Sequence, residues 1–586
     1  MSHNGSQNSQ ELGSQGLLRQ LAEAAGLAVN WKNYRNQDRT VGTDTLRAIL
    51  HALDIAADSD AQCRHSLEQL KQESAAQIPR LLVGRVGEKL CLPPALRHEL
   101  QRDEQFTLID DRGALTKVGV SNEGPDYCVE LPRQPGYYYL QNQSRELALA
   151  VAPQRCTSVM DLTGKHRAWG VGAQLYSLRR NGDGGVGDFT ALREFAVGVA
   201  RAGADGVAVS PVHAQFAADR SRYSPYSPSS RLFINVLYID PEQTFSPELV
   251  KSGLRQAHLE ASHGQLEREA LINWPEAARA KLTLLRHLWE RKQAELMDKT
   301  SQLGRAFQQF REHAGEALEL HAIFETLHAH HLANDSQAWH WRHWEPRFRD
   351  HGTRAVEKFA AENRHEILFH SFLQWLADRG LADAHAASRE AGAAIGLIAD
   401  LAVGTDSGGS HAWSRQEDML TGLTIGAPPD MLNHQGQDWG LTSFSPRALT
   451  AHGYAPMREM LRASLRHAGG LRIDHILGLR RLWLIPEGAA AHEGAYLHFP
   501  QNDLLSLVAL ESWRHQAIIV GEDLGTIPGN FREQLATTGL LGMGVLWFEK
   551  DNGLFIDPSR WRSNAQATTT THDLPTVAGW WQGRDL

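Results

Sequence analysis

Three carboxylic acids in the second half of the sequence each follow a short run of apolar or β-branched residues. Asp474 lies in Leu-Arg-Ile-Asp-His, Glu522 follows Ile-Ile-Val-Gly, and Asp573 comes after Thr-Thr-Thr-Thr-His. Cleavage of a glycosidic bond with retention needs a carboxylate nucleophile and, about 5 Å away, a carboxylic acid that protonates the leaving oxygen. The three acids therefore predict one site for glycosidic bond chemistry.

The surroundings of the acids favour different roles. Arg472 precedes Asp474 by two residues and so faces the same side of a strand, where its guanidinium can hold a carboxylate ionised. We therefore expect Asp474 to be the nucleophile. The apolar run before Glu522 raises a carboxyl pKa and favours a general acid/base. The neighbouring Asp523 points to the opposite side of the strand, so we expect it to be structural.

Asp573 lies between His572 and a Leu-Pro pair that must end the strand, so both polar side chains belong at the rim of the site. There Asp573 can bind sugar hydroxyls and favour a distorted, oxocarbenium-like ring. Any one of the three acids alone predicts a helix cap or a salt bridge, and only their joint placement is specific. A metal-dependent hydrolase that uses His572 and Asp573 is a distant alternative.

Seven strand-like runs alternate with helical segments from about Trp169 onward, which is typical of βα units around a parallel sheet. In a β/α barrel the carboxyl ends of all strands share one catalytic face, so acids far apart in sequence can meet there. We predict an α/β fold, a (β/α)8-type barrel over residues 160–586 with a helical insertion at about 248–364. We place its strands at 172–176, 206–210, 397–401, 471–474, 518–522, 544–548 and 567–571.

The first part of the chain predicts smaller, separate regions. Residues 1–15 are polar and form a disordered tail. Residues 16–75 have apolar residues at helical spacing and predict a small helical region, with Thr43 as an N-cap. Residues 78–155 contain short strands divided by turns and predict a β-sandwich.

Composition and targeting signals exclude several classes. The net charge of −9 is spread without a block of like charges, so we expect no nucleic acid and no membrane as a partner. The polar amino terminus and the lack of an 18-residue apolar run predict a cytoplasmic protein. From four cysteines without a Cys-x-x-Cys pair we expect neither disulfides nor a zinc framework. His328, His330 and His331 lack a His-Glu-x-x-His pattern, so we expect no metal site.

Seven short motifs occur along the second two thirds of the chain: Ser-Pro-Tyr-Ser-Pro-Ser-Ser-Arg (224–231), Asp-Leu-Ala-Val-Gly (400–404), Gly-Ala-Pro-Pro-Asp (426–430), Gly-Gln-Asp-Trp-Gly (436–440), Arg-Ile-Asp-His (472–475), Gly-Glu-Asp-Leu-Gly (521–525) and Thr-His-Asp-Leu-Pro-Thr (571–576). In these motifs the chain resembles the amylomaltase-type 4-alpha-glucanotransferases, glycoside hydrolase family 77 of the alpha-amylase clan, and the resemblance runs from about Leu17 to its end. This resemblance implies a retaining transfer of α-1,4-glucan segments between maltooligosaccharides, without organic cofactor, phosphate or catalytic metal. It gives Asp474, Glu522 and Asp573 the roles of nucleophile, acid/base and transition-state stabiliser.

The resemblance also implies which residues bind the substrate. Tyr226 would stack on the donor sugar, Asp400 would add a polar contact, and Trp439 with the loop that ends at Asp430 would form the acceptor side. The cleavage subsite would be lined by Arg472, His475 and His572. Transfer exceeds hydrolysis only when the acceptor is held and water is excluded. We expect the helical insertion and the 404–440 loop to form a lid that holds the acceptor and excludes water.

The sequence departs from the family at its carboxyl end. Family members continue beyond the point that corresponds to Leu586, so we expect the eighth βα unit to be missing and the chain to be a truncated reading of a longer protein. A barrel that lacks one unit has open edges with unpaired backbone groups. Two alternatives therefore stay open: a non-catalytic or truncated glucan-binding protein, and an α-glucan hydrolase of the same clan.

Overall fold

The computed structural model describes residues 15–96, 105–123, 126–142, 145–431 and 433–584. The predicted disordered tail, residues 1–15, lies outside this range except for its last residue. Within the described part of the chain, no helix combines the length and the apolar character that crossing a bilayer requires.

Five parallel strands form the centre of the molecule and determine where the acids lie. Beyond them, β22 (Gly542–Val545) and β25 (Ala565–Thr568) form a parallel pair, linked to the central sheet by a single bridge between Val520 and Leu541. A strand of the structure corresponds to each of the seven that the sequence predicts, with boundaries that shift slightly toward the amino terminus. The central sheet has the order β10 (Gly170–Ala173), β11 (Gly206–Val209), β14 (Gly396–Leu401), β18 (Gly470–Ile473) and β21 (Ile518–Gly521).

Amphipathic helices cover the parallel strands. In α5 (Phe189–Arg201), buried apolar residues recur every three to four positions, and the Asp188 side chain caps the first turn by accepting from the Ala191 amide. This helix packs against α12 (Arg364–Glu390) in one apolar core. A second core joins β18 and β21 to α15 (Ala455–Leu465) and α16 (Gln501–His515). The strand ends, with their polar residues, are thus held on a rigid support.

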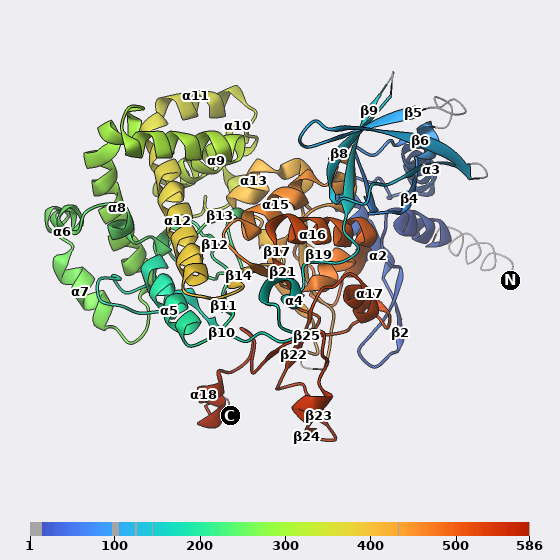
Figure 1. The fold of residues 1–586 in the computed structure, drawn as a ribbon. Helices are drawn as coiled ribbons and strands as arrows, with labels where there is room; N and C mark the ends of the chain where they lie inside the picture. Colours follow the sequence, from blue (N-terminus) through green and yellow to red (C-terminus); the bar gives the residue numbers. More distant parts are fainter. Residues whose placement is uncertain (1–14, 97–104, 124–125, 143–144, 432, 585–586) are drawn as a thin grey trace, which may run out of the picture.

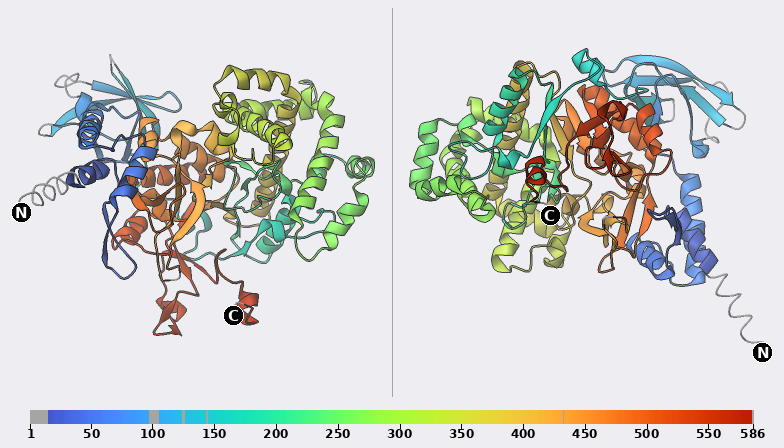
Figure 2. Two further views of the ribbon diagram at one scale, coloured as in Figure 1. Left: turned by 180° about the vertical axis from the view of Figure 1, so that it is seen from behind. Right: turned by 90° about the horizontal axis from the view of Figure 1, so that it is seen from below.

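Helices occupy the range in which the sequence predicts an insertion. They lie between β13 (Ser230–Ile234) and β14 and gather on one side of the molecule, away from the amino-terminal regions (Figures 1 and 2). The helix α9 (Gln302–Asn334) contains a break at Gly315, whose φ of 56° is left-handed. The insertion helices are α6 (Pro247–Gln256), α7 (Glu260–Arg268), α8 (Trp274–Met297), α9 (Gln302–Asn334), α10 (Pro346–Arg349) and α11 (Arg354–Glu362).

A second, antiparallel sheet of five strands was not predicted from the sequence. It packs against the amino-terminal region, because Leu21, Leu46 and Ile49 share one core with Ile425 and Leu484 of this sheet. Its order is β15 (Thr405–Asp406), β17 (Gln437–Thr442), β16 (Leu423–Ala427), β19 (Arg481–Pro486) and β20 (Ala495–His498).

The amino-terminal region is less purely helical than predicted. Residues 15–24 are helical and are followed by a hairpin of β1 (Asn30–Lys32) and β2 (Asp38–Thr40), then by α2 (Thr43–Ala52) and α3 (Asp60–Ala76). Thr43 is the first residue of α2, and Gly42 occupies the N-cap position in its place. The hairpin was missed because its strands are short and carry mostly polar residues.

Seven strands between residues 81 and 152 form one continuous sheet where the sequence predicts a β-sandwich. The sheet folds over a single core that includes Leu82, Phe106, Val129 and Leu149. The strand order is β3 (Leu81–Arg85), β9 (Glu146–Ala152), β8 (Gly136–Gln141), β5 (Gln105–Asp110), β6 (Leu115–Glu123), β7 (Asp126–Glu130) and β4 (Lys89–Cys91). The two strands at the ends of this order, β3 and β4, are consecutive in the sequence.

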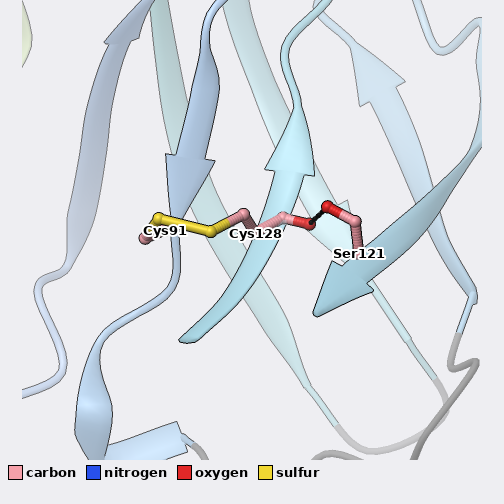
Figure 3. Close-up of a disulfide and its surroundings, with 3 residues drawn as sticks. All are labelled: Cys91, Ser121 and Cys128. Atoms are coloured by element: carbon pink, nitrogen blue, oxygen red, sulfur yellow. Dashed lines mark hydrogen bonds between the residues drawn. A yellow bond between two sulfur atoms is a disulfide. The ribbon is translucent and has the colours of Figure 1, made fainter. Parts of the chain in front are cut away.

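A disulfide joins Cys91 and Cys128 in this sheet, which contradicts the expectation drawn from cysteine spacing (Figure 3). The two residues are direct partners in the antiparallel pairing of β4 with β7, and their Cα atoms lie 4.0 Å apart. Pairing of strands that are 37 residues apart in sequence leaves no spacing signal. Cys63 and Cys156 are buried free thiols.

Asp523 has the structural role predicted for it. Its fully buried carboxylate accepts hydrogen bonds from Arg562 at 2.7 and 3.1 Å, from Arg532 at 2.9 Å and from the Met543 amide at 2.8 Å. These contacts tie the end of β21 to β22 and to the segment that leads into β25.

We predict that Asp523→Asn lowers the free energy of unfolding by about 3 kcal/mol, because it leaves two arginines without their buried carboxylate. Thermal and urea unfolding would measure the loss. Asp551→Asn is the matched control, since Asp551 is exposed on β23 (Lys550–Asp551). Equal stability of the two variants would contradict the role of Asp523.

Candidate active site

The carboxyl ends of β14, β18 and β21 place three acidic side chains next to one another. Asp400 is the direct neighbour of Arg472 in the parallel register of β14 and β18. The Asp474 amide donates to Leu401 O and the Glu522 amide donates to Ile473 O, each at 3.0 Å. The strand pairing itself therefore brings the predicted nucleophile and the predicted acid/base to one edge.

The Arg472 guanidinium joins the carboxylates, as predicted from its position two residues before Asp474. Its Nη2 donates to Asp474 Oδ1 at 2.8 Å, and its Nη1 donates to both oxygens of Asp400 at 2.7 and 2.9 Å. The Tyr226 hydroxyl also donates to Asp400 Oδ2, at 2.8 Å. Burial raises the pKa of Asp474 to about 6, and the guanidinium opposes this rise by favouring the charged carboxylate.

Glu522 is held by the backbone. Its Oε2 accepts from the His475 amide at 3.0 Å and its Oε1 from the Leu524 amide at 2.8 Å. Burial raises the pKa of Glu522, while these amides oppose the rise. The sequence predicted this direction from the apolar run that precedes Glu522.

Two backbone features make that arrangement possible. His475 has a left-handed conformation with φ 46° and ψ 61°, which costs a non-glycine residue free energy and occurs preferentially at functional sites. Gly521 lies against the turn that follows, because a Cβ at this position would come within 2.7 Å of Ile476 Cγ1. A larger side chain at position 521 would displace the side chain of Ile476, the residue that follows His475.

Asp573 is less enclosed than the other two acids. Its side chain is 77% exposed, and its Oδ1 lies 3.2 Å from His572 Nε2. The His572 ring stacks on Tyr226, with centroids 3.7 Å apart and planes at 14°. Tyr226 thus contacts both Asp400 and His572, so it links the segment that carries Asp573 to Asp400 and, through Arg472, to Asp474.

Two further predicted substrate contacts come from the second sheet. Trp439 on β17 packs edge-on against His475, with ring centroids 5.3 Å apart. Asp430 lies on the loop between β16 and β17, where its Oδ1 accepts from the Asn433 amide at 2.6 Å. The structure therefore brings Trp439 to the acids and places Asp430 on the neighbouring loop.

Sequence reasoning missed some groups that shape this site. Arg231 is buried and donates from Nη1 to the carbonyls of Ala402 and Val403, at 3.3 and 3.0 Å, directly after β14. Its place at the end of the 224–231 motif was the available signal. The amides of His475 and Leu524 gave no signal in the sequence, because every residue except proline supplies a backbone amide.

Within the described residues, no group of three or more His, Cys, Asp or Glu side chains could hold a metal ion.

Comparison with known proteins identifies the family. The family model described as 4-alpha-glucanotransferase, glycoside hydrolase family 77, matches residues 173–586. The 4-alpha-glucanotransferase of Mycobacterium tuberculosis strain H37Rv is 34% identical over 97% of this chain and 80% of its own length. That of Haemophilus influenzae is 33% identical over 85% of this chain and 72% of its own length.

A solved structure agrees with this assignment. The amylomaltase of Corynebacterium glutamicum matches 97% of this chain and 81% of its own chain, with a TM-score of 0.80 and 29% sequence identity. The mixed α/β fold is therefore that of an amylomaltase. The chain belongs to glycoside hydrolase family 77, the 4-alpha-glucanotransferases.

Proposed function

We propose that this protein is a 4-alpha-glucanotransferase that moves α-1,4-glucan segments between maltooligosaccharides by a retaining double displacement. The observation that carries the proposal is the pair Asp474 and Glu522 on adjacent strand ends, with the Arg472 guanidinium bonded to the first and two backbone amides bonded to the second. Its membership of glycoside hydrolase family 77 supports the transfer activity.

In the first step, Asp474 attacks the anomeric carbon of the donor, and the bond from that carbon to the glycosidic oxygen breaks. Glu522 gives its proton to that oxygen, and the shortened glucan leaves with a free 4-hydroxyl. The Arg472 contact favours the ionised Asp474 that this step needs, and burial favours the protonated Glu522.

In the second step, the 4-hydroxyl of an acceptor glucan attacks the anomeric carbon of the glucosyl ester. Glu522 takes the proton of that hydroxyl, and the ester bond to Asp474 breaks, which restores both carboxyl groups. Asp573, on the exposed side next to His572, would bind hydroxyls of the distorted sugar, and Trp439 would support the acceptor. Water that occupies the acceptor position would give hydrolysis.

We also infer that the seven parallel strands belong to a (β/α)8-type barrel. Their parallel order and the placement of the acids at their carboxyl ends support this view. The amino-terminal regions and the helical insertion would then be additions to that barrel. The substrate partners would be α-1,4-glucans and maltooligosaccharides.

Incubation with maltotriose tests the reaction class. We predict glucose together with maltopentaose and longer oligomers, because a transferred maltosyl unit lengthens a second maltotriose. Chromatography of the products measures the outcome, with and without a strong chelator. Products limited to maltose and glucose would support the hydrolase. Loss of activity with the chelator would support the metal-dependent alternative. Binding without turnover would support a glucan-binding protein.

The roles of the two buried acids can be separated. We predict that Asp474→Asn lowers kcat by several orders of magnitude for every donor, because no ester forms, while maltooligosaccharide binding persists. Glu522→Gln should lose as much in kcat/KM with maltotriose but much less in kcat/KM with α-maltosyl fluoride, because kcat/KM reports the first step and fluoride leaves without protonation.

Initial rates with both donors, and calorimetric titration with maltoheptaose, would measure these effects. Asp551→Asn is the control for handling and stability, since Asp551 is exposed on β23. Near-normal turnover by Asp474→Asn would refute its assignment as the nucleophile.

The pH dependence follows from the pKa of Asp474. Burial raises this pKa to about 6, so the carboxylate is progressively protonated below that pH and cannot attack. We predict that kcat/KM falls about tenfold per unit below pH 6. A pH profile of the initial rate at low maltotriose concentration measures this acidic fall in kcat/KM. A rate that stays constant down to pH 4 would contradict the prediction.

A further inference from the structure

Three consecutive ring-bearing residues of the helical insertion contact the short turn that follows β15. The Trp341 Nε1 donates to the Ser407 carbonyl at 2.8 Å, and His340 Nε2 lies 3.3 Å from the Ser407 hydroxyl oxygen. Trp339 lies against Gly408, where a Cβ would come within 2.9 Å of the indole ring. The insertion is therefore packed directly on this turn, and a side chain at position 408 would push the two segments apart.

Arg222 joins both of these segments to the segment that carries Tyr226. Its guanidinium carbon lies 3.5 Å from the centroid of the Trp339 ring, and its Nη1 donates to Asp406 Oδ2 at 2.6 Å. The Asp406 side chain is buried, and its Oδ1 accepts from the Gly408 amide at 2.8 Å. Arg222 comes four residues before Tyr226 in the sequence. A planar guanidinium can bond a carboxylate at its edge and stack on an indole with its face, so one side chain holds three segments together.

The turn that Arg222 holds borders the strand that carries Trp439. The strand β15 is only two residues long and pairs antiparallel with β17, with Asp406 opposite Leu441. Among the described strands, β15 is the only neighbour of β17 on that side of the second sheet. Trp439 precedes Leu441 by two residues and packs edge-on against His475. Because a two-residue strand supplies few hydrogen bonds, the position of β17 also depends on side-chain contacts to this turn.

We propose that Arg222 is a positioning residue that fixes the insertion, through Trp339, and the edge of the second sheet, through Asp406, and so favours transfer to a glucan over hydrolysis. The proposal rests on the proposed function, in which a glucan and water compete for the same ester on Asp474. Loss of the contact would let Trp439 leave the position in which it supports the acceptor glucan, whereas water needs no such support. The hydrolysed fraction of the ester would then rise.

The ratio of hydrolysis to transfer tests this role. With α-maltosyl fluoride as the donor and excess labelled glucose as the acceptor, transfer gives labelled maltotriose and hydrolysis gives unlabelled maltose, which chromatography separates. Arg222→Met should raise the ratio of maltose to maltotriose roughly five- to tenfold, while kcat/KM for fluoride release, which reports the first step, stays within about threefold of wild type. Arg222→Lys should give an intermediate ratio, since it keeps the charge but not the planar face.

Arg347→Met is the matched control. Arg347 also lies over an aromatic ring, that of Phe348 at 5.0 Å, and pairs with Glu345 at 2.7 Å, but it belongs to α10 of the insertion. Its removal should leave the product ratio unchanged. Trp339→Leu should raise the ratio as Arg222→Met does, and the double variant should add little, because both residues act through one contact. Fully additive increases would overturn the proposal.

Hydrogen exchange separates this inference from the proposed function. In Arg222→Met, the amides of residues 339–341 and 437–442 should exchange faster than in the wild type, and in Arg347→Met they should not. A wild type that forms maltose but no maltotriose would refute the transferase proposal, and the exchange pattern would still show whether Arg222 holds the insertion to the sheet. Unchanged exchange or an unchanged product ratio in Arg222→Met would overturn the role of Arg222, and the transferase proposal would stand if the wild type makes maltotriose.

Discussion

The Arg472 guanidinium is the contact on which the arrangement of the acids depends. Asp400 and Asp474 end neighbouring strands, and without a cation between them two buried carboxylates would repel each other. Burial of each charge costs several kcal/mol unless it is paired. One side chain offsets both costs, because its two terminal nitrogens face different carboxylates. The parallel register that sets Arg472 opposite Asp400 is therefore as much a part of the site as the acids themselves.

The parallel strands and the buried part of the site could be predicted because the sequence carries a direct physical signal for them. A run such as Ile-Ile-Val-Gly before Glu522 is apolar on both faces, as a buried parallel strand must be, and a charged residue at its end must leave the core. The pairing of Arg472 with Asp474 follows from the two-residue period of a strand. These signals are local, so a single sequence suffices to read them.

Other features depend on contacts that no local pattern records. The second sheet joins short strands from residues 405 to 498, and the disulfide joins Cys91 to Cys128 through the pairing of β4 with β7. Glu522 is held by backbone amides, and one of them comes from His475, whose left-handed conformation is not predictable from a histidine in the sequence. The exposure of Asp573 also depends on which segments pack around it, so its motif did not predict it.

The shared core of the amino-terminal region and the second sheet has a thermodynamic consequence for the acceptor side. Leu21 and Leu46 pack in one core with strands of the sheet that carries Trp439. Residues 15–76 therefore cannot be treated as a detachable accessory, because their removal would strip one face of that sheet. An acceptor glucan that orders Trp439 would therefore also stabilise the packing of the amino-terminal helices on this sheet. Linkage makes this coupling reciprocal, so a better-packed amino-terminal core would raise the affinity for the acceptor by the factor by which the acceptor stabilises the core.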